Sequence, residues 1–160
     1  MGTALRPMPD DALGVWRANA EAHYLAERIA AGDTPEYAAK RVAQSQEYFP
    51  GGRPAEGQLV FQVVERGEDG GDDTVVGALW IGLLDPDQPT AWWVLDVEID
   101  EEHRGKGYGR AAMRLAEQEA RARGGDRIGL NVFGPNTVAR SLYDSLGYRV
   151  TATNMTKELR

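Results

Sequence analysis

Residues 91–112 read Ala-Trp-Trp-Val-Leu-Asp-Val-Glu-Ile-Asp-Glu-Glu-His-Arg-Gly-Lys-Gly-Tyr-Gly-Arg-Ala-Ala, and this stretch decides the fold. Its first nine residues are mostly apolar, β-branched or aromatic, which predicts a strand over Ala91–Ile99. Glycines at positions 105, 107 and 109 then predict a tight loop. After the loop, apolar residues recur at helical spacing until Gly124-Gly125. The stretch therefore predicts a strand, a glycine loop and a helix in direct succession.

The glycine loop Arg104-Gly105-Lys106-Gly107-Tyr108-Gly109 has the features of a phosphate-binding site. Because it follows the carboxyl end of a strand and opens a helix, free backbone N–H groups and the positive end of the helix dipole converge there. The glycines let an anion approach the backbone closely, and Arg104, Lys106 and Arg110 add positive charge. A loop with a purely structural role is the alternative.

Two common phosphate-binding patterns do not fit this loop. A P-loop ends in Gly-Lys-Ser/Thr, whereas Gly109 is followed by Arg110-Ala111, which disfavours NTP hydrolysis. The dinucleotide pattern G-x-G-x-x-G fails because the spacing here is G-x-G-x-G and no βαβ unit precedes it. A glycine-loop nucleotide binder therefore remains an alternative with the wrong spacing.

The rest of the chain predicts a mixed α/β or α+β domain, and at 160 residues we expect a single domain, residues 1–160. The further elements expected are an edge strand over residues 3–7, helices over 10–31 and 34–49, strands over 58–64 and 74–84, a strand over 127–133, a helix over 136–146 and a last strand over 148–159. The strands over 58–64 and 74–84 read as a hairpin with a solvated loop. The unit from residue 91 to 133 is expected to hold two parallel strands.

Composition argues against several classes of protein. The formal net charge of -7 disfavours binding to nucleic acid or to an anionic membrane, since both depend on clustered Lys and Arg. No apolar run approaches the roughly 20 residues that span a bilayer, and the N-terminus lacks a secretory pattern. The chain has no cysteine, which excludes disulfides and thiol nucleophiles. We therefore expect a cytoplasmic protein that acts on a basic or amine-bearing partner.

The glycine loop resembles the Q/R-x-x-G-x-G/A signature of the GNAT superfamily, which in that family grips the pyrophosphate of acetyl-CoA. Further residues follow in the family's order: the strand end Val97-Glu98-Ile99, the run Asn131-Val-Phe-Gly-Pro-Asn136, and a helix that carries Tyr143 before Gly147-Tyr148. The match is strong over residues 91–159. The resemblance implies a mixed, mostly antiparallel sheet flanked by helices, with a splayed pair of parallel central strands.

The resemblance also implies roles for individual residues. Backbone groups of Val97 and Ile99 would pair with the pantetheine arm, and the strands that carry Glu98 and Asn131 would part to admit it. Asn136 matches a position that commonly hydrogen-bonds the cofactor, and Tyr143 matches the residue that protonates the departing thiolate in many members. A phenol suits that task because it can donate a proton without carrying charge itself. The loop residues expected to bind the phosphates are Arg104, Gly105, Lys106, Gly107, Tyr108, Gly109 and Arg110.

The alternative role for Tyr143 is that of a core tyrosine, which packs beside Leu142 and Leu146.

The general base is not identified by Tyr143. Some members of the family use a Glu at the position of Asn131, and an amide cannot take a proton. Glu98 and Asp96 on the neighbouring strand are the substitutes, unless both are solvated charges at a strand end.

Two histidines complete the set of candidates. His23 lies on a helix that the family uses to shape the acceptor pocket, and His103 precedes the glycine loop. Most single histidines are surface residues, and neither position matches a motif.

Together these residues predict an N-acetyltransferase that moves an acetyl group from acetyl-CoA to a primary amine by direct attack in a ternary complex, without a metal. The acceptor is expected to be a small molecule or a peptide, and a cationic amine suits the acidic chain. A homodimer fits too, since sheet edges in the family often pair. The alternative is a non-catalytic acyl-CoA sensor or partner-binding module on the same fold, which the amide at Asn131 favours.

Overall fold

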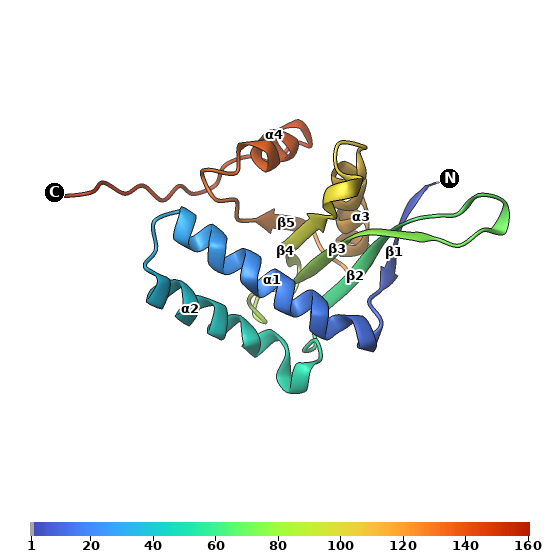
Figure 1. Ribbon diagram of the computed structural model, residues 1–160, viewed down its shortest axis with the longest axis horizontal. Coiled ribbons are helices and arrows are strands. Elements are labelled where there is room, and N and C mark those ends of the chain that lie inside the picture. Colours follow the sequence, from blue (N-terminus) through green and yellow to red (C-terminus); the bar gives the residue numbers. More distant parts are fainter. Residues whose placement is uncertain (1) are drawn as a thin grey trace.

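The structure, a computed structural model, describes residues 2–160 and contains one five-stranded sheet with helices on both faces (Figure 1). The strands are β1 (Thr3–Pro7), β2 (Gln58–Glu65), β3 (Thr74–Leu83), β4 (Ala91–Ile99) and β5 (Arg127–Leu130). The α-helices are α1 (Asp10–Ala30), α2 (Pro35–Gln44), α3 (Tyr108–Ala122) and α4 (Thr137–Ser145).

The strands lie side by side in the order in which they occur along the chain, from β1 to β5. The first four pair antiparallel, and β2 and β3 form the expected hairpin. β5 runs parallel to β4, as the crossover through α3 requires. The predicted fold class, a mixed and mostly antiparallel sheet flanked by helices with one parallel pair, is confirmed.

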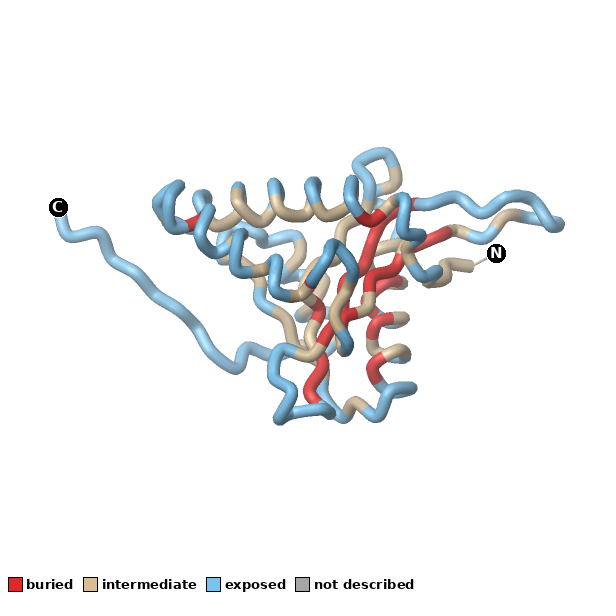
Figure 2. Tube along the Cα trace, turned by 90° about the horizontal axis from the view of Figure 1, so that it is seen from below, coloured by how far each residue is buried: buried red, intermediate tan, exposed pale blue. Residues whose placement is uncertain are grey.

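Apolar residues on the two faces of the sheet form separate cores. On one face α3 presents small and flexible side chains, among them Ala112, Met113 and Ala116, to Leu79 and Ile81 of β3. These five residues are fully buried, which leaves the α3 face of the sheet dry. Figure 2 shows that buried residues follow the central strands, whereas the hairpin loop and the C-terminal segment are exposed.

The opposite face is covered by α1 and by the turn after α2. Leu13 and Trp16 of α1 pack with Phe49 and Trp80, and the Trp16 ring meets the Trp80 ring edge-on at 5.8 Å. The Trp80 indole N–H donates to Gln58 Oε1 at 2.9 Å, which satisfies this buried donor. This core fills only one end of α1, so the rest of that helix is free to border a cavity.

The predicted start of α2 is confirmed in detail, and its predicted end is wrong. Thr34 caps the helix by accepting a hydrogen bond from the Tyr37 N–H, and Pro35 takes the first helical position. The helix was expected to reach residue 49, but it ends at Gln44 and continues as a 3-10 turn, Ser45–Tyr48. This tighter turn brings Phe49 into the core beneath α1.

Two strand predictions near the C-terminus are also wrong. The strand expected over 127–133 stops at Leu130, because its pairing with β4 ends there. The last strand expected over 148–159 is absent: residues 149–160 are exposed, form neither helix nor strand, and run away from the sheet (Figures 1 and 2). A strand needs a neighbour for its backbone groups, and no strand in residues 2–160 pairs with the segment.

Candidate active site

A β-bulge in β4 determines where its carboxylates point. Ile81 of β3 pairs with Val94, but the preceding Trp80 pairs with Asp96, so Leu95 is the extra residue. Side chains normally alternate between the faces of a sheet, and the extra residue shifts that alternation by one. Val94 and Val97 therefore both contribute to the core under α3, whereas Asp96 and Glu98 lie on the α1 side, opposite Trp80 and Ala78.

β4 and β5 separate soon after they meet. Their pairing covers only residues 91–94 of β4 and 127–130 of β5, while β4 itself continues to Ile99. A small pocket of about 80 Å³ opens where they part. Its lining includes Asp96 and Val97 of β4, Asn131 beyond β5, and Tyr143 of α4. The predicted parting of the two parallel strands is thus present, but Asn131 lies just after β5 and not on it.

The glycine loop follows β4 and leads directly into α3. Gly105 and Gly107 have positive φ angles of 76° and 89°, and the space where a Cβ would lie is open at both. Gly107 is also the N-cap of α3, so the first N–H groups of that helix have no partner within the helix. An open backbone and unpaired helix amides are what an anionic phosphate needs.

The three cations of the loop lie in different environments. The Arg104 Nε donates to the Ile99 carbonyl at 2.9 Å, so this side chain turns back toward the end of β4. The Arg110 guanidinium donates to Ser145 Oγ at 2.9 Å and joins α3 to α4. Lys106 is exposed beside the open glycines. Lys106 is consequently the loop cation with the most freedom to approach a phosphate.

A second, larger cavity of about 470 Å³ lies between α1 and the sheet. Small side chains of α1, including Ala20 and Ala26, leave the space, and its polar lining comes from Asn19, His23, Glu98 and Asp100. Only one of these four carries positive charge, and only when it is protonated. The cavity is therefore suited to a cation or an amine.

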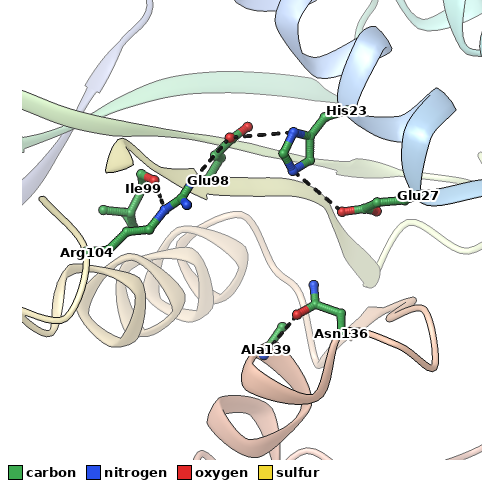
Figure 3. Close-up of polar contacts among 7 residues, drawn as sticks. All are labelled: His23, Glu27, Glu98, Ile99, Arg104, Asn136 and Ala139. Carbon is green, nitrogen blue, oxygen red and sulfur yellow. Dashed lines mark hydrogen bonds and ion pairs between the residues drawn. The ribbon is translucent and has the colours of Figure 1, made fainter. Parts of the chain in front are cut away.

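Glu98 is held at the floor of this cavity by two basic side chains (Figure 3). Its Oε1 lies 3.8 Å from His23 Nδ1 and 3.7 Å from Arg104 Nη2. His23 also lies 3.9 Å from Glu27, one turn along α1. Burial raises the pKa of Glu27, and the Glu98 charge adds to that rise although His23 opposes it. The carboxylates of α1 and β4 therefore compete for one imidazole.

Asp96 has the most unusual environment of the site. Its Oδ2 is inaccessible to solvent and has no hydrogen-bond partner in residues 2–160. Burial raises the pKa of this carboxyl to about 7, and the negative charge of Glu98 adds to the rise. His23 and the Trp16 indole lower it only in part. At neutral pH both the protonated and the ionised form of the Asp96 carboxyl are consequently populated. A pKa near the working pH suits a group that accepts a proton.

Tyr143 lines the same small pocket as Asp96. Burial raises the pKa of its phenol, and the nearby Asp96 and Glu27 charges add to the effect, so the hydroxyl keeps its proton at neutral pH. Its ring meets that of Tyr148 edge-on at 6.0 Å, and both rings pack against the α3 core. Tyr143 therefore packs against the core, as one of the two expectations had it, and also lines the pocket; its catalytic role stays a prediction.

The two asparagines occupy different positions around the pocket. Asn131 lines it directly and is exposed. Asn136 lines it too, but its Oδ1 accepts the Ala139 N–H at 3.2 Å and so caps α4 (Figure 3). This capping role alone explains why an Asn stands at position 136. The hydrogen bond uses only Oδ1, so the side-chain NH₂ group can still donate to a ligand.

Sequence reasoning missed part of the site. Glu27 was not singled out, although it borders the small pocket and interacts with His23. Its spacing of four residues from His23 on a helix was a usable signal. His103, by contrast, packs edge-on against Tyr108 and lines neither cavity.

Comparison with known proteins agrees with this geometry. Residues 16–148 match the model of the Acetyltransferase (GNAT) family. The chain belongs to the GNAT family. By sequence it is 27% identical over 163 residues to the uncharacterized N-acetyltransferase YdgE of Bacillus subtilis, with 99% of both chains covered. It is 37% identical over 86 residues to the uncharacterized N-acetyltransferase YycN of the same organism, covering 53% of this chain and 54% of YycN.

The crystal structure of Bacillus subtilis YycN superposes on this GNAT chain with a TM-score of 0.86 at 29% identity, and 99% of each chain is covered.

Within residues 2–160, no cluster of three or more His, Asp or Glu side chains is placed to hold a metal ion. None of the helices described is long and apolar enough to cross a membrane.

The raised pKa of Asp96 predicts a pH-dependent stability. The folded protein binds this proton more tightly than the unfolded chain, so wild-type stability should fall as pH rises from about 4 to about 7 and then level off. Asp96→Asn stays neutral throughout, and its melting temperature should exceed that of wild type by about 5–10 °C at pH 8. Calorimetry at pH 4 to 8 measures the difference, with Asp100→Asn as an exposed control; a pH-independent difference would contradict the raised pKa.

Proposed function

We propose that this GNAT chain is an acetyl-CoA-dependent N-acetyltransferase whose acceptor is a primary amine that carries positive charge in solution. One observation carries the proposal: Asp96, whose pKa is near 7 and whose buried Oδ2 has no hydrogen-bond partner in residues 2–160, and Tyr143, a phenol that keeps its proton, line one pocket where β4 and β5 part. A proton acceptor and a proton donor side by side are what acyl transfer to an amine requires. A cytoplasmic location, which the lack of cysteine favours, belongs to the same proposal.

The glycine loop would hold the phosphates of the donor. The open space beside Gly105 and Gly107, the free amides of the first turn of α3 and the exposed Lys106 together fit a pyrophosphate. Beyond Val94 one edge of β4 has no strand beside it, so backbone groups of Val97 would be available to an extended arm such as pantetheine, as would the N–H of Ile99, whose carbonyl already accepts from Arg104. That arm would end in the pocket lined by Asp96, Asn131 and Tyr143.

Two side chains of this protein would transfer protons in the reaction: one would accept a proton from the acceptor amine, and the other would donate a proton to the departing sulfur. Acetyl-CoA supplies the acetyl group as a thioester, from which an attacking amine nitrogen displaces the thiolate. Before attack, Asp96 in its ionised form takes a proton from the acceptor ammonium, so that the nitrogen has a free lone pair. As the carbon–sulfur bond breaks, the Tyr143 hydroxyl gives its proton to the sulfur, and the second proton that the nitrogen loses as the amide forms restores the phenol. Asn131 cannot take the proton of the ammonium, and Asp96 is the better base because Glu98 is already bound by His23 and Arg104.

The acceptor would enter through the cavity beside α1. Glu98 and Asp100 give it a negative lining, and Glu27 and Asp96 lie just beyond. The negative charge of this lining would attract a cationic amine. Only the reacting nitrogen would have to lose its proton, where the acceptor reaches Asp96. The cavity of about 470 Å³ has room for a small molecule or for a single peptide side chain.

The proposed donor site predicts specific binding of CoA esters. Acetyl-CoA should raise the melting temperature of the wild-type protein, whereas Gly107→Glu should abolish that rise, because it adds a carboxylate where a phosphate binds and strains a left-handed backbone. Gly124→Glu is the matched control: Gly124 has a φ of 83° and open space, but it lies at the far end of α3. If acetyl-CoA fails to stabilise the wild type, or if ATP or NAD stabilises it instead, the donor site is wrong.

The role of Tyr143 is tested by turnover. Thiol release from acetyl-CoA should be detected with at least one member of a panel of polyamines, aminoglycosides, amino acids and peptides. Tyr143→Phe should lower kcat by about 100-fold with little change in acetyl-CoA affinity, since only the proton donor is lost. Tyr148→Phe removes the neighbouring hydroxyl, which contacts Glu117 at 3.3 Å, and should leave kcat near wild type. Normal CoA binding without thiol release on any amine would favour the non-catalytic sensor instead.

The base is identified by comparing two carboxylates. In the wild type, kcat/KM should rise with pH through about 7, as Asp96 loses its proton. Asp96→Asn should lower kcat by about 100-fold and remove that ionisation from the profile. Glu98→Gln should mainly raise the KM of a cationic acceptor, because it removes charge from the cavity without removing the base. The reverse pattern would identify Glu98 as the base.

A further inference from the structure

Carboxylates recur at every second residue along the α1 face of β4. Asp96 and Glu98 both lie on that face, and past the bulge the alternation of side chains is regular. Asp100 continues the row, because its N–H still donates to the Val76 carbonyl of β3 at 2.9 Å and its side chain lines the same cavity as Glu98. Alternate residues of a strand lie about 7 Å apart. The end of β4 therefore presents negative charges at intervals of about this length.

The row of carboxylates runs from the proposed reaction site into the larger cavity. Asp96 lines the small pocket, and its buried Oδ2 has no hydrogen-bond partner in the part of the chain that the structure describes. Glu98 and Asp100 line the cavity of about 470 Å³ between α1 and the sheet. The two spaces adjoin, since His23 at the border of the cavity lies 3.9 Å from Glu27 at the border of the pocket. A ligand that reaches Asp96 through the cavity must therefore pass Glu98.

The lining that α1 contributes to the cavity is mostly apolar. Its apolar members are Trp16, Ala20, Ala22 and Ala26. The other two, Asn19 and His23, offer few hydrogen bonds to a ligand rich in hydroxyl groups. Of the described residues that line this cavity, His23 is the one that can carry positive charge, so the carboxylate of an amino acid would meet mainly negative charge there. The lining thus favours an unbranched aliphatic chain that is charged only at its nitrogens.

Glu98 can accept a further cation. Its two basic neighbours, His23 and Arg104, both approach Oε1, at 3.8 and 3.7 Å (Figure 3). These distances are longer than a hydrogen bond, and the Arg104 Nε is already held by the Ile99 carbonyl at 2.9 Å. An ionised carboxylate can accept about four hydrogen bonds. An ammonium group in the cavity can consequently bind to Glu98 without displacing either neighbour.

We propose, on the basis of the proposed function, that the acceptor is a linear aliphatic diamine whose second ammonium group binds to Glu98 and Asp100 while the first gives its proton to Asp96. Single bonds of about 1.5 Å in a staggered, extended chain place the nitrogens of putrescine about 6 Å apart and those of cadaverine about 7.5 Å apart. These spacings match the interval of about 7 Å between alternate residues of β4. The methylene groups between the nitrogens pack against the apolar lining from α1.

Acetylation removes the charge from one end of the diamine. The carbon–nitrogen bond forms and the carbon–sulfur bond breaks; of the two protons that the nitrogen loses, one goes to Asp96 and the other replaces the proton that Tyr143 gives to the sulfur. The product has a neutral amide at one end and an ammonium group at the other. A product that entered in the reverse direction would place its amide at Glu98, where a charge is needed. The site therefore adds one acetyl group to each diamine.

The first test compares amines of matched length on the wild type. The kcat/KM of putrescine should exceed that of n-butylamine by about 10-fold, mainly through KM, because the second charge binds equally before and during the reaction. γ-Aminobutyrate, with a carboxylate in place of the second amine, should react more slowly than n-butylamine. Mass spectrometry should find a single acetyl group on putrescine. Equal kcat/KM values for putrescine and n-butylamine overturn the diamine and leave the proposed function standing, whereas no thiol release with any amine overturns both.

The second test locates the charge that selects the diamine. Glu98→Gln should reduce the preference for putrescine over n-butylamine to about 2-fold, and Glu98→Gln with Asp100→Asn should abolish it. This ratio is independent of the identity of the base, since both amines need one. Glu102→Gln is the matched control and should keep the preference, because Glu102 is exposed in the turn after β4 and lines neither cavity. A double variant that keeps the wild-type preference, or a control that loses it, overturns the proposal.

A third measurement needs no variant. Added salt should lower the preference of the wild type for putrescine, because counterions screen the attraction between the second ammonium group and the carboxylates. The kcat/KM of n-butylamine, measured in the same buffers, corrects for any general effect of salt on the enzyme. A preference that stays constant from low to high salt contradicts a charged contact and overturns the proposal.

Discussion

The arrangement of the site depends on how β4 pairs with its two neighbours. On one side β3 accompanies it along most of its length, and the bulge at Leu95 changes which face its side chains take. On the other side β5 accompanies it only to Val94. The first constraint turns Asp96 and Glu98 toward α1, and the second leaves part of β4 without a neighbour. Without the bulge, Asp96 would point into the dry core beneath α3, where a carboxyl without a partner would cost about 1–3 kcal/mol or more.

This geometry gathers carboxylates on a chain that is already acidic. Asp96 and Glu98 of β4 face Glu27 of α1, and the nearby basic groups, His23 and Arg104, both contact Glu98. Burial of the Asp96 carboxyl, and next the repulsion by Glu98, raise its pKa to about 7, and within residues 2–160 it has no ion-pair partner that would lower it again. The fold tolerates this buried group because the two apolar cores on either face of the sheet carry the stability. A cationic acceptor would relieve the same repulsion on entry.

Local patterns predicted local structure well. The Thr34-Pro35 cap, the β2–β3 hairpin and the order of strand, glycine loop and helix after Ala91 are all confirmed, because each depends on neighbours within a few residues. The bulge could not be predicted, since Leu95 reads as one more strand residue until its register with β3 is known. The role of Glu27 was missed for a related reason: it becomes significant only when α1 lies over β4. Likewise, the strand predicted over 148–159 is absent because its sequence favours a strand but no strand in residues 2–160 pairs with it.

The end of α4 connects the C-terminal segment to the site. Gly147 in the left-handed conformation and the hydrogen bond from the Tyr148 N–H to the Tyr143 carbonyl form the C-terminal cap of α4. The residue proposed as proton donor is therefore the residue whose carbonyl holds the start of the segment. Asn136 caps the other end of this nine-residue helix, which contains no fully buried residue. So short and exposed a helix depends on its two ends for a fixed position. The orientation of the Tyr143 ring in the pocket therefore depends on the caps at the two ends of α4.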